Sequence, residues 1–387
     1  MTSASTAPSP REILARLVSF DTTSSKTNLP LLAYVEDFLA QHGVTSSRVP
    51  SPCGEKASLF ASIGPAGSGI GLSGHTDVVP VTGQSWESDP FTLTERDGRL
   101  YGRGSADMKG FLACVMAAVP MFKRRKLAVP IHILFSYDEE VGCTGVRPMI
   151  AELGKSLPAP RAIIVGEPTS MTVVDAHKGP VRFQVEVTGL PTHSSMAHLG
   201  VNAITYAGRL LGELDRIEQE LKAGQQNARF TPSYTTLQVG LINGGTAPNI
   251  VAGACSFAWE MRALPGLDVE AIRKRLEDFA ARRCLPEMRE VSPDADITIR
   301  LTGQVPAYLA RAGSEAVSLA LQLAGQNETF AVSYAAEAGL FEEAALASVI
   351  CGPGDIAQAH TANEFIVPSE LDKCMVFLDR LADWATQ

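Results

Sequence analysis

An imidazole and a carboxylate stand two positions apart in the stretch Gly74-His75-Thr76-Asp77, directly after an apolar run. In an extended backbone, the side chains of His75 and Asp77 lie on the same face of the strand. An acid in this position can orient a metal-binding histidine through the second nitrogen of the imidazole ring. The pair alone also fits an ordinary surface hydrogen bond. The hypothesis of a metal site therefore depends on the other acids of the chain.

Four later stretches repeat this pattern, in which a short β-like run is followed by an acid or a histidine. The side chains concerned are Asp107, Glu139 and Glu140, Glu167, and His360. Ligand sites in an open α/β sheet form beyond the carboxyl ends of the strands, so these side chains are expected at one edge of a sheet. The glycines of Gly102-Arg103-Gly104 permit a tight backbone that would bring Asp107 to the same edge.

Four acids in one cleft require positive charge beside them, because like charges raise one another's pKa and resist joint ionisation. Two divalent metal ions would supply that charge. Mixed histidine and carboxylate ligation suits zinc, cobalt or manganese better than magnesium. No cysteine belongs to the set, which argues against a structural thiolate site. The sequence therefore predicts two divalent ions, with zinc, cobalt and manganese as the candidates.

The composition is that of an ordinary globular protein, with 387 residues, 45% hydrophobic content and a net charge of -9. This length allows two domains. The negative charge argues against nucleic acid or an anionic membrane as a partner. Neither a long apolar run nor a signal peptide is recognised. Seven scattered cysteines without a CxxC pair indicate reduced thiols, so a cytoplasmic protein is expected.

Residues 1–177 and 304–387 show strands that alternate with helices, which is typical of a mainly parallel sheet sandwiched by helices. The predicted strands are Ser58 to Ile63, Gly69 to Ser73, Ile131 to Tyr137, Arg161 to Val165 and Ser348 to Cys351. The predicted helices are Arg11 to Phe20, Leu31 to His42, Asp107 to Lys123, Gly145 to Leu153, Glu315 to Ala324 and Ser369 to Ala385. The fold class that this order predicts is α/β.

Residues 178–303 follow a different order and are predicted to form an inserted lid domain. Its predicted strands are Val181 to Thr188, Thr235 to Ile242, Cys255 to Ala263 and Ala295 to Leu301. Its predicted helices are Asn202 to Lys222 and Val269 to Arg283. The order β-α-β-β-α-β is that of a ferredoxin-like α+β sandwich.

Six motifs, in order along the chain, resemble those of the dinuclear zinc aminoacylase and carboxypeptidase family. They are Gly74 to Asp77, Gly102 to Gly110, Asp138 to Glu140, Gly166 to Thr169, Pro191 to Ser195, and Ala359-His360. The resemblance spans nearly the whole chain and implies a zinc-exopeptidase-like catalytic domain with an inserted lid. Within the family, His177-Lys178-Gly179, Ala336 to Leu340 and Cys351 to Asp355 are most similar to the members that deacetylate acetylornithine.

The resemblance implies that Asp107 bridges two metal ions. His75 and Glu167 would complete one site, and Glu140 and His360 the other. Two catalytic roles are also implied: Asp77 would fix the tautomer of His75, and Glu139 would be the general base. His193 of the lid would stabilise the tetrahedral oxyanion, in the family usually at the active site of the partner subunit. A homodimer through the lid is therefore expected by resemblance.

The substrate's carboxylate requires a cation or amide donors, and Arg262 and Asn249 resemble the family's carboxylate-binding pair. Asn249 also fits ordinary turn chemistry. Glu337 could meet the cationic side chain of ornithine, and its alternative is an acid exposed at the start of a helix.

The expected reaction is removal of the acetyl group from N2-acetyl-L-ornithine, which gives L-ornithine and acetate for arginine biosynthesis. One alternative keeps the mechanism and changes the small-molecule substrate, as in hydrolysis of acetylcitrulline, succinyl-diaminopimelate, other N-acyl amino acids or dipeptides. A second alternative is a catalytically silent homologue that binds metal. A serine hydrolase is a distant third, because Ser73 does not stand in GxSxG.

Overall fold

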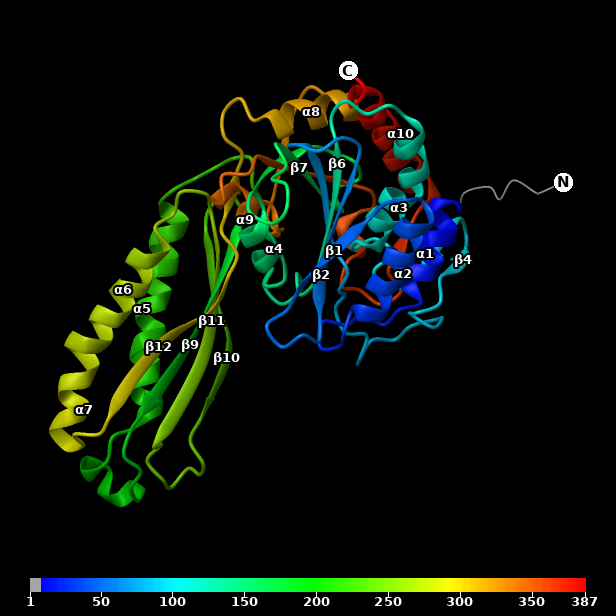
Figure 1. Cartoon of the computed structure of the whole chain (residues 1–387). Helices are drawn as coiled ribbons and strands as arrows, with labels where there is room; N and C mark the ends of the chain where they lie inside the picture. Colours follow the sequence, from blue (N-terminus) through cyan, green and yellow to red (C-terminus); the bar gives the residue numbers. More distant parts are fainter. Residues whose placement is uncertain (1–7) are drawn as a thin grey trace. The chain divides into compact units, whose positions relative to one another are not determined.

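The structure, a computed structural model, describes residues 8–387 and divides into two compact units (Figure 1). The first unit comprises Met1–Asp175, Leu309–Phe330 and Ala336–Gln387, and the second comprises Ala176–Tyr308 and Ala331–Ala335. Each unit buries its own large apolar cluster.

A nine-stranded sheet forms the centre of the first unit. Its strands are β1 (Ser46–Pro50), β2 (Ala57–Ile63), β3 (Ile70–His75), β6 (Ile131–Ser136), β7 (Ala162–Pro168), β8 (Val174–His177), β13 (Tyr308–Leu309), β14 (Phe330–Val332) and β15 (Ser348–Gly352). The order is β1-β2-β6-β3-β7-β15-β8-β13, and β14 pairs with β8. The central strands β6, β3, β7 and β15 are parallel, whereas β1, β2 and β8 join by antiparallel pairs.

Helices cover both faces of this sheet. They are α1 (Pro10–Val18), α2 (Leu29–Gln41), α3 (Lys109–Arg124), α4 (Val146–Glu152), α8 (Glu315–Ala324), α9 (Ala338–Glu343) and α10 (Pro368–Trp384). Figure 1 shows α1, α2, α3 and α10 on one side of the sheet, and α4 and α9 on the other. A Cβ atom at Gly166 would lie 2.1 Å from the ring of Phe111 in α3. Only glycine therefore lets α3 pack this closely on β7.

A small three-stranded sheet joins two distant parts of the first unit. It consists of β4 (Thr94–Arg96), β5 (Arg99–Tyr101) and β16 (Phe365–Ile366), in the order β16-β5-β4. Phe365 lies opposite Tyr101 in the antiparallel pair of β16 and β5. This pairing brings the segment after His360 beside the segment that precedes Asp107.

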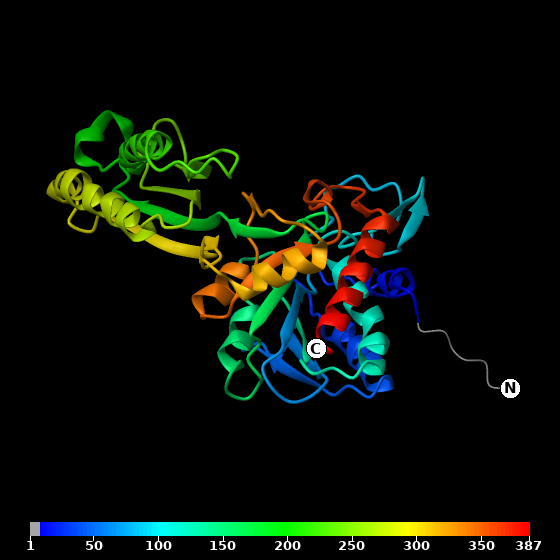
Figure 2. The same ribbon diagram turned by 90° about the horizontal axis from the view of Figure 1, so that it is seen from above.

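The second unit is a four-stranded antiparallel sheet with helices on one face (Figure 2). Its elements are β9 (Gly179–Thr188), α5 (Ala203–Ala223), β10 (Thr236–Gly244), β11 (Ala254–Ala263), α6 (Val269–Phe279), α7 (Leu285–Val291) and β12 (Asp296–Gln304). The spatial order is β10-β11-β9-β12. Its core contains the stacked rings of Phe183 and Trp259, whose centroids are 4.4 Å apart.

The structure confirms the predicted fold class, an α/β sheet that contains parallel strands and a separate α+β sheet unit. The helix predicted from Val269 to Arg283 differs in detail. It leaves the α-helical pattern after Phe279, continues as a π-helical turn over Ala280–Cys284, and leads into α7. Pro286 stands in the first turn of α7, where proline is tolerated. Among residues 8–387, no helix has the length and apolar character needed to cross a membrane.

Candidate metal centre

Three neighbouring strands carry predicted site residues at or just beyond their carboxyl ends. His75 is the last residue of β3, Glu139 and Glu140 follow β6, and Glu167 lies near the end of β7. Strands β6 and β7 flank β3 on its two sides. Because neighbouring strands are about 4.8 Å apart, their end residues can reach a common point.

The first ligand group consists of His75, Asp107 and Glu167, all of them buried. His75 Nε2 lies 3.1 Å from Asp107 Oδ1 and 3.9 Å from Glu167 Oε1. Among the described residues 8–387, Glu167 Oε1 is a buried oxygen without a hydrogen-bond partner. A buried, unpaired carboxylate oxygen beside an imidazole nitrogen is well suited to hold a cation.

The second ligand group consists of Asp107, Glu140 and His360. His360 Nε2 lies 2.9 Å from Glu140 Oε2 and 3.3 Å from Asp107 Oδ2. The two oxygens of Asp107 thus face two different imidazoles. In each group the potential ligand atoms all lie within 4.8 Å of one another. This donor set fits a pair of divalent metal ions that share one bridging carboxylate.

The electrostatics of the site match this crowding of acids. Burial, together with the neighbouring carboxylates, raises the pKa of Glu139 to about 8 and that of Glu140 to about 7. The same causes raise the pKa of Glu167 well above its usual value. Burial alone would lower the pKa of His75, but hydrogen bonds with Asp107 and Asp77 raise it well above its usual value. The acids therefore compete for the little positive charge that the protein supplies.

Asp77 holds both the imidazole and the turn after β6. Its backbone carbonyl lies 2.9 Å from His75 Nδ1, closer than its carboxylate Oδ1 at 3.5 Å. The carboxylate accepts the backbone N–H groups of Glu139 (3.1 Å) and Glu140 (3.3 Å). It also accepts the hydroxyl of Ser24 at 2.7 Å. The predicted orientation of His75 is thus made mainly by the backbone of Asp77, while the carboxylate fixes the turn.

Sequence reasoning missed two side chains that hold this turn. The buried thiol of Cys143 donates to Glu139 Oε1 at 3.1 Å, and Lys56 forms an ion pair with Asp138. Lys56 is far from Asp138 in the sequence, so no local signal could reveal their contact. For Cys143, the one available signal was its position three residues after Asp138-Glu139-Glu140.

Glu337 lies inside the first unit and is only 1% exposed. Its carboxylate accepts the hydroxyls of Ser73 and Ser136, which belong to β3 and β6. Burial raises the pKa of Glu337 to about 7. The alternative of an exposed acid at a helix start is therefore wrong. Two serine donors leave further acceptor sites on the carboxylate, so the contact with a cationic side chain stays a prediction.

The three predicted site residues of the second unit are not gathered at one point of that unit. His193 and Asn249 are exposed and adjacent: His193 forms a β-bridge with Ile250, and Ser194 N–H donates to the carbonyl of Asn249. Arg262 stands near the far end of β11, where Nε donates to Glu260 at 2.7 Å. At about 3.3 Å per residue, Arg262 lies roughly 27 Å beyond the start of β11. Arg262 and Asn249 of one chain therefore cannot bind the same carboxylate.

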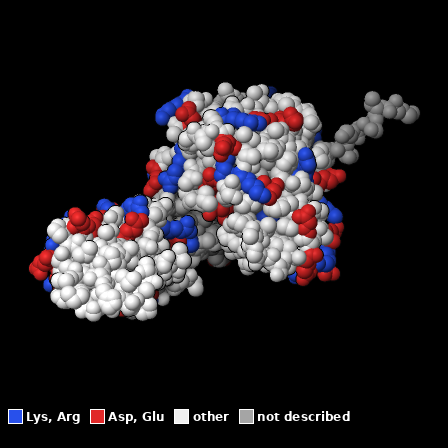
Figure 3. All heavy atoms as spheres, turned by 90° about the horizontal axis from the view of Figure 1, so that it is seen from below, with Lys and Arg blue, Asp and Glu red and all other residues white. Residues whose placement is uncertain are grey.

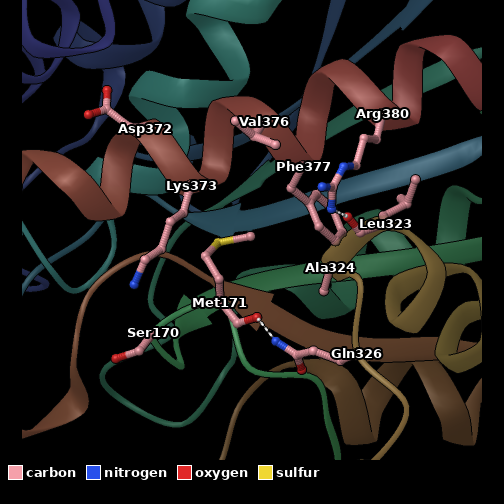
Figure 4. A pocket seen from close by; sticks show the side chains of 10 residues that line it. All are labelled: Ser170, Met171, Leu323, Ala324, Gln326, Asp372, Lys373, Val376, Phe377 and Arg380. Carbon is pink, nitrogen blue, oxygen red and sulfur yellow. Dashed lines mark hydrogen bonds between the residues drawn. The ribbon is translucent and has the colours of Figure 1, made fainter.

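The first unit also has a cavity of about 460 Å³ that none of the predicted site residues lines. Figure 4 shows it between α10, the end of α8 and the turn after β7, with Met171, Val376 and Phe377 among its apolar walls. Gln326 also lines the cavity, and its side-chain amide donates a hydrogen bond to the backbone carbonyl of Met171. The metal-ligand chemistry thus lies elsewhere in this unit.

Comparison with known proteins gives the family. Residues 71–384 match the model of peptidase family M20/M25/M40, and the chain belongs to this family. It is 36% identical over 382 residues to acetylornithine deacetylase of Myxococcus xanthus, covering 97% of each chain. It is 32% identical over 382 residues to acetylornithine deacetylase of Pasteurella multocida, again covering 97% of each chain. The resemblance inferred from the six motifs is confirmed, and the chain is a hydrolase that acts on amide bonds.

Solved structures show the same fold. Aminopeptidase PepT from Bacillus cereus aligns with a TM-score of 0.76 at 18% identity, covering 98% of each chain. An M20 family metallo-carboxypeptidase from Sulfolobus solfataricus also gives a TM-score of 0.76 at 18% identity, covering 98% of this chain and 99% of the other.

Removal of metal is expected to destabilise the protein more as the pH rises. Because the pKa values of Glu139 and Glu140 are raised to about 8 and about 7, the folded state holds more protons there than the unfolded state. Ionising these two acids costs stability in the metal-free folded state. The metal-free protein therefore loses stability as the pH rises, and the loss is complete once the pH has passed through 7 and 8. The increase in melting temperature on adding Zn²⁺ to chelator-treated protein should be larger at pH 8.5 than at pH 6.

The control is Asp107→Asn, which removes the carboxylate common to both ligand groups. This variant should show little Zn²⁺-dependent increase at either pH. An increase in the unmodified protein that is equal at both pH values, or larger at pH 6, would contradict the electrostatic account.

Proposed function

We propose that the chain is a metal-dependent amidohydrolase that removes the acetyl group from N2-acetyl-L-ornithine, giving L-ornithine and acetate. The observation that carries this proposal is the pair of ligand groups that share Asp107, with Glu139 beside them. Similarity to two acetylornithine deacetylases over 97% of the chain supports the choice of substrate. The related alternatives differ in the acyl group or the amino acid.

The two ligand groups are proposed to hold two divalent ions, with zinc favoured and cobalt as the alternative. His75 and Glu167 would hold one ion, Glu140 and His360 the other, and Asp107 both. When bound, such ions polarise a carbonyl group and lower the pKa of water. They would also offset the mutual repulsion of the carboxylates, which the protein's two imidazoles balance only in part.

Glu139 is proposed as the general base. It belongs to neither ligand group, so its ionised carboxylate is free to accept a proton from the attacking water and pass it to the leaving amine. Two contacts position it: the Cys143 thiol donates to its side chain, and Asp77 accepts its backbone N–H. The base is thus held at both its backbone and its carboxylate.

Glu139→Gln should lower turnover by about 10²- to 10⁴-fold, because it removes the proton acceptor and leaves both ligand groups intact. Turnover of N2-acetyl-L-ornithine and metal content by mass spectrometry are the measurements. Asp138→Asn is the matched control, since it makes the same chemical change one position earlier, at a carboxylate that faces Lys56. A Glu139→Gln enzyme that keeps its metals and the unmodified turnover would falsify the general-base assignment.

Arg262 is proposed to bind the α-carboxylate of the substrate. Its hydrogen bond to Glu260 uses Nε and steadies the guanidinium, whose terminal nitrogens can bind a carboxylate with two donors. An arginine in such a position selects for N-acyl amino acids over neutral amides.

A panel of substrates tests the proposed acyl amino acid. N2-acetyl-L-ornithine should show a higher kcat/KM than acetylcitrulline, succinyl-diaminopimelate, other N-acetyl amino acids and dipeptides. N2-acetylornithine amide lacks the carboxylate charge, so its kcat/KM should be much lower than that of N2-acetyl-L-ornithine in the unmodified enzyme. Arg262→Ala should lower the kcat/KM of the amide only a little further. If acetylornithine ranks among the poorest substrates, the narrow proposal fails while the amidohydrolase chemistry stands.

Residues 178–303 are proposed to act as a lid and to form a homodimer. β10 is an edge strand of the second unit, and its Leu241 and Ile242 are 72% and 57% exposed. Met196, Leu199 and Ile250 are also exposed, and Figure 3 shows few charged side chains on this end of the unit. An unpaired, apolar edge strand is a template for pairing with a second copy. In such a dimer His193 and Asn249 would act together at the partner's active site.

Ile242→Asp should weaken this association, because it places a charge in the proposed apolar contact. The molar mass in solution, measured by light scattering after size-exclusion chromatography, should fall from that of a dimer toward that of a monomer. Leu301→Asp is the matched control, since Leu301 is 50% exposed on the opposite edge strand β12. A monomeric unmodified protein, or an equal effect of both substitutions, would remove β10 as the interface.

A further inference from the structure

Glu364 is a buried carboxylate outside both ligand groups, and it stands four positions after His360. It is only 1% exposed and lies just before β16. The motifs of the sequence did not single it out. Its contacts nevertheless connect the two loops that carry Asp107 and His360.

The carboxylate of Glu364 accepts four donors from the segment 102–107. Oε1 accepts the backbone N–H groups of Ala106 at 2.9 Å and Asp107 at 3.0 Å. Oε2 accepts the backbone N–H of Gly104 at 2.9 Å and Arg103 Nη1 at 2.8 Å. The loop that ends in Asp107, the ligand shared by both groups, is therefore held in place by the side chain of Glu364.

A second link runs from the same loop to His360 itself. Arg103 Nη2 donates to Gln84 Oε1, and Gln84 Nε2 donates to the backbone carbonyl of His360 at 2.9 Å. The indole N–H of Trp86 donates to the same Gln84 oxygen at 3.1 Å, and the Arg103 guanidinium lies 5.1 Å from the centre of the Trp86 ring. Glu364, Arg103 and Gln84 thus form a continuous chain of hydrogen bonds between Asp107 and His360.

These loops lack regular secondary structure that could hold their ligands. Gly104 has φ +80° and His360 has φ 62°, so both adopt the left-handed region. For the non-glycine residue this conformation is uncommon and needs support from its surroundings. The contacts of Glu364 and Gln84 supply that support at the positions beside the two ligands.

The chemistry of the contacts requires a carboxylate. All four partners are donors, and they converge on two oxygens that can accept two hydrogen bonds each. A glutamine of the same shape would turn an NH₂ group toward two N–H donors. The loop would have to shift to relieve this contact, and Asp107 would shift with it.

We propose that Glu364 is a positioning residue for the metal centre, which sets the separation of Asp107 from His360. Gln84 extends its action to the His360 backbone. This inference rests on the proposed metal-binding function of the two ligand groups. Outer groups that orient metal ligands change metal affinity or activity by about 10- to 100-fold when they are substituted.

The test measures Zn²⁺ binding to chelator-treated protein by calorimetric titration with a competing chelator. The unmodified protein should bind two ions. Glu364→Gln should bind Zn²⁺ about 10- to 100-fold more weakly at both sites, because Asp107 belongs to both ligand groups. Gln84→Ala should weaken only the site that contains His360, which separates positioning from a general loss of folding.

Glu370→Gln is the matched control. Glu370 is also buried, at 7% exposure, and accepts a backbone N–H, that of Gly354, at 3.2 Å. Its other partner is Lys373, so neither hydrogen bond reaches the segment 102–107 or His360 itself. Its substitution should change the melting temperature as Glu364→Gln does, yet leave both Zn²⁺ affinities unchanged.

Two outcomes overturn the inference: Glu364→Gln binding two ions as tightly as Glu370→Gln, or Gln84→Ala keeping the unmodified affinity at both sites. If Glu364→Gln does not fold, the Gln84→Ala titration decides. An unmodified protein that binds no Zn²⁺ rejects the proposed function instead. The two failures are therefore distinguishable.

Discussion

The constraint that shapes the first unit is the repulsion among carboxylates in a buried site. Asp107, Glu140 and Glu167 lie around two imidazoles, and Glu139 stands beside them. Burial penalises every ionised acid, and each neighbouring acid adds to that penalty. Protons could relieve the repulsion, but they would occupy the oxygens that are proposed to bind the metal ions. Metal ions would relieve it while leaving the carboxylates ionised, so the same crowding that costs stability favours bound cations.

The fold meets this constraint with a rigid part and an irregular part. The rigid part is the row of strands β6, β3 and β7, whose carboxyl ends present Glu140, His75 and Glu167 side by side. Close packing of α3 on these strands, made possible by glycine beside Phe111, keeps the row in place. The irregular part supplies Asp107 and His360 from loops. Hydrogen bonds therefore replace secondary structure as the means of holding these two ligands.

The sequence could predict the rigid part because each ligand there follows an apolar strand, and parallel strands end at one edge. It could also predict the βαββαβ order of the second unit from apolar periodicity. It could not predict Glu364, Gln84 or Lys56, since their partners are distant in sequence and their residue types are common on any surface. Glu337 was placed wrongly in one alternative because an acid beside a helix start is usually exposed, whereas here two serines make its burial tolerable. Arg262 and Asn249 of one chain cannot share a carboxylate for a different reason: the length of the intervening strand separates them.

That separation bears on how one substrate could be bound. His193 and Asn249 share one end of the second unit, whereas Arg262 lies near the other end of β11, roughly 27 Å from its start. An N-acyl amino acid is far shorter than this span, so its carboxylate and its scissile carbonyl cannot reach both ends of one sheet. If all three side chains serve one reaction, they must come from two chains. The apolar edge strand β10 gives a physical route to such an assembly, because a two-fold contact would use the same surface on both copies. Catalysis and association would then depend on one another, and dilution of the protein would lower its specific activity.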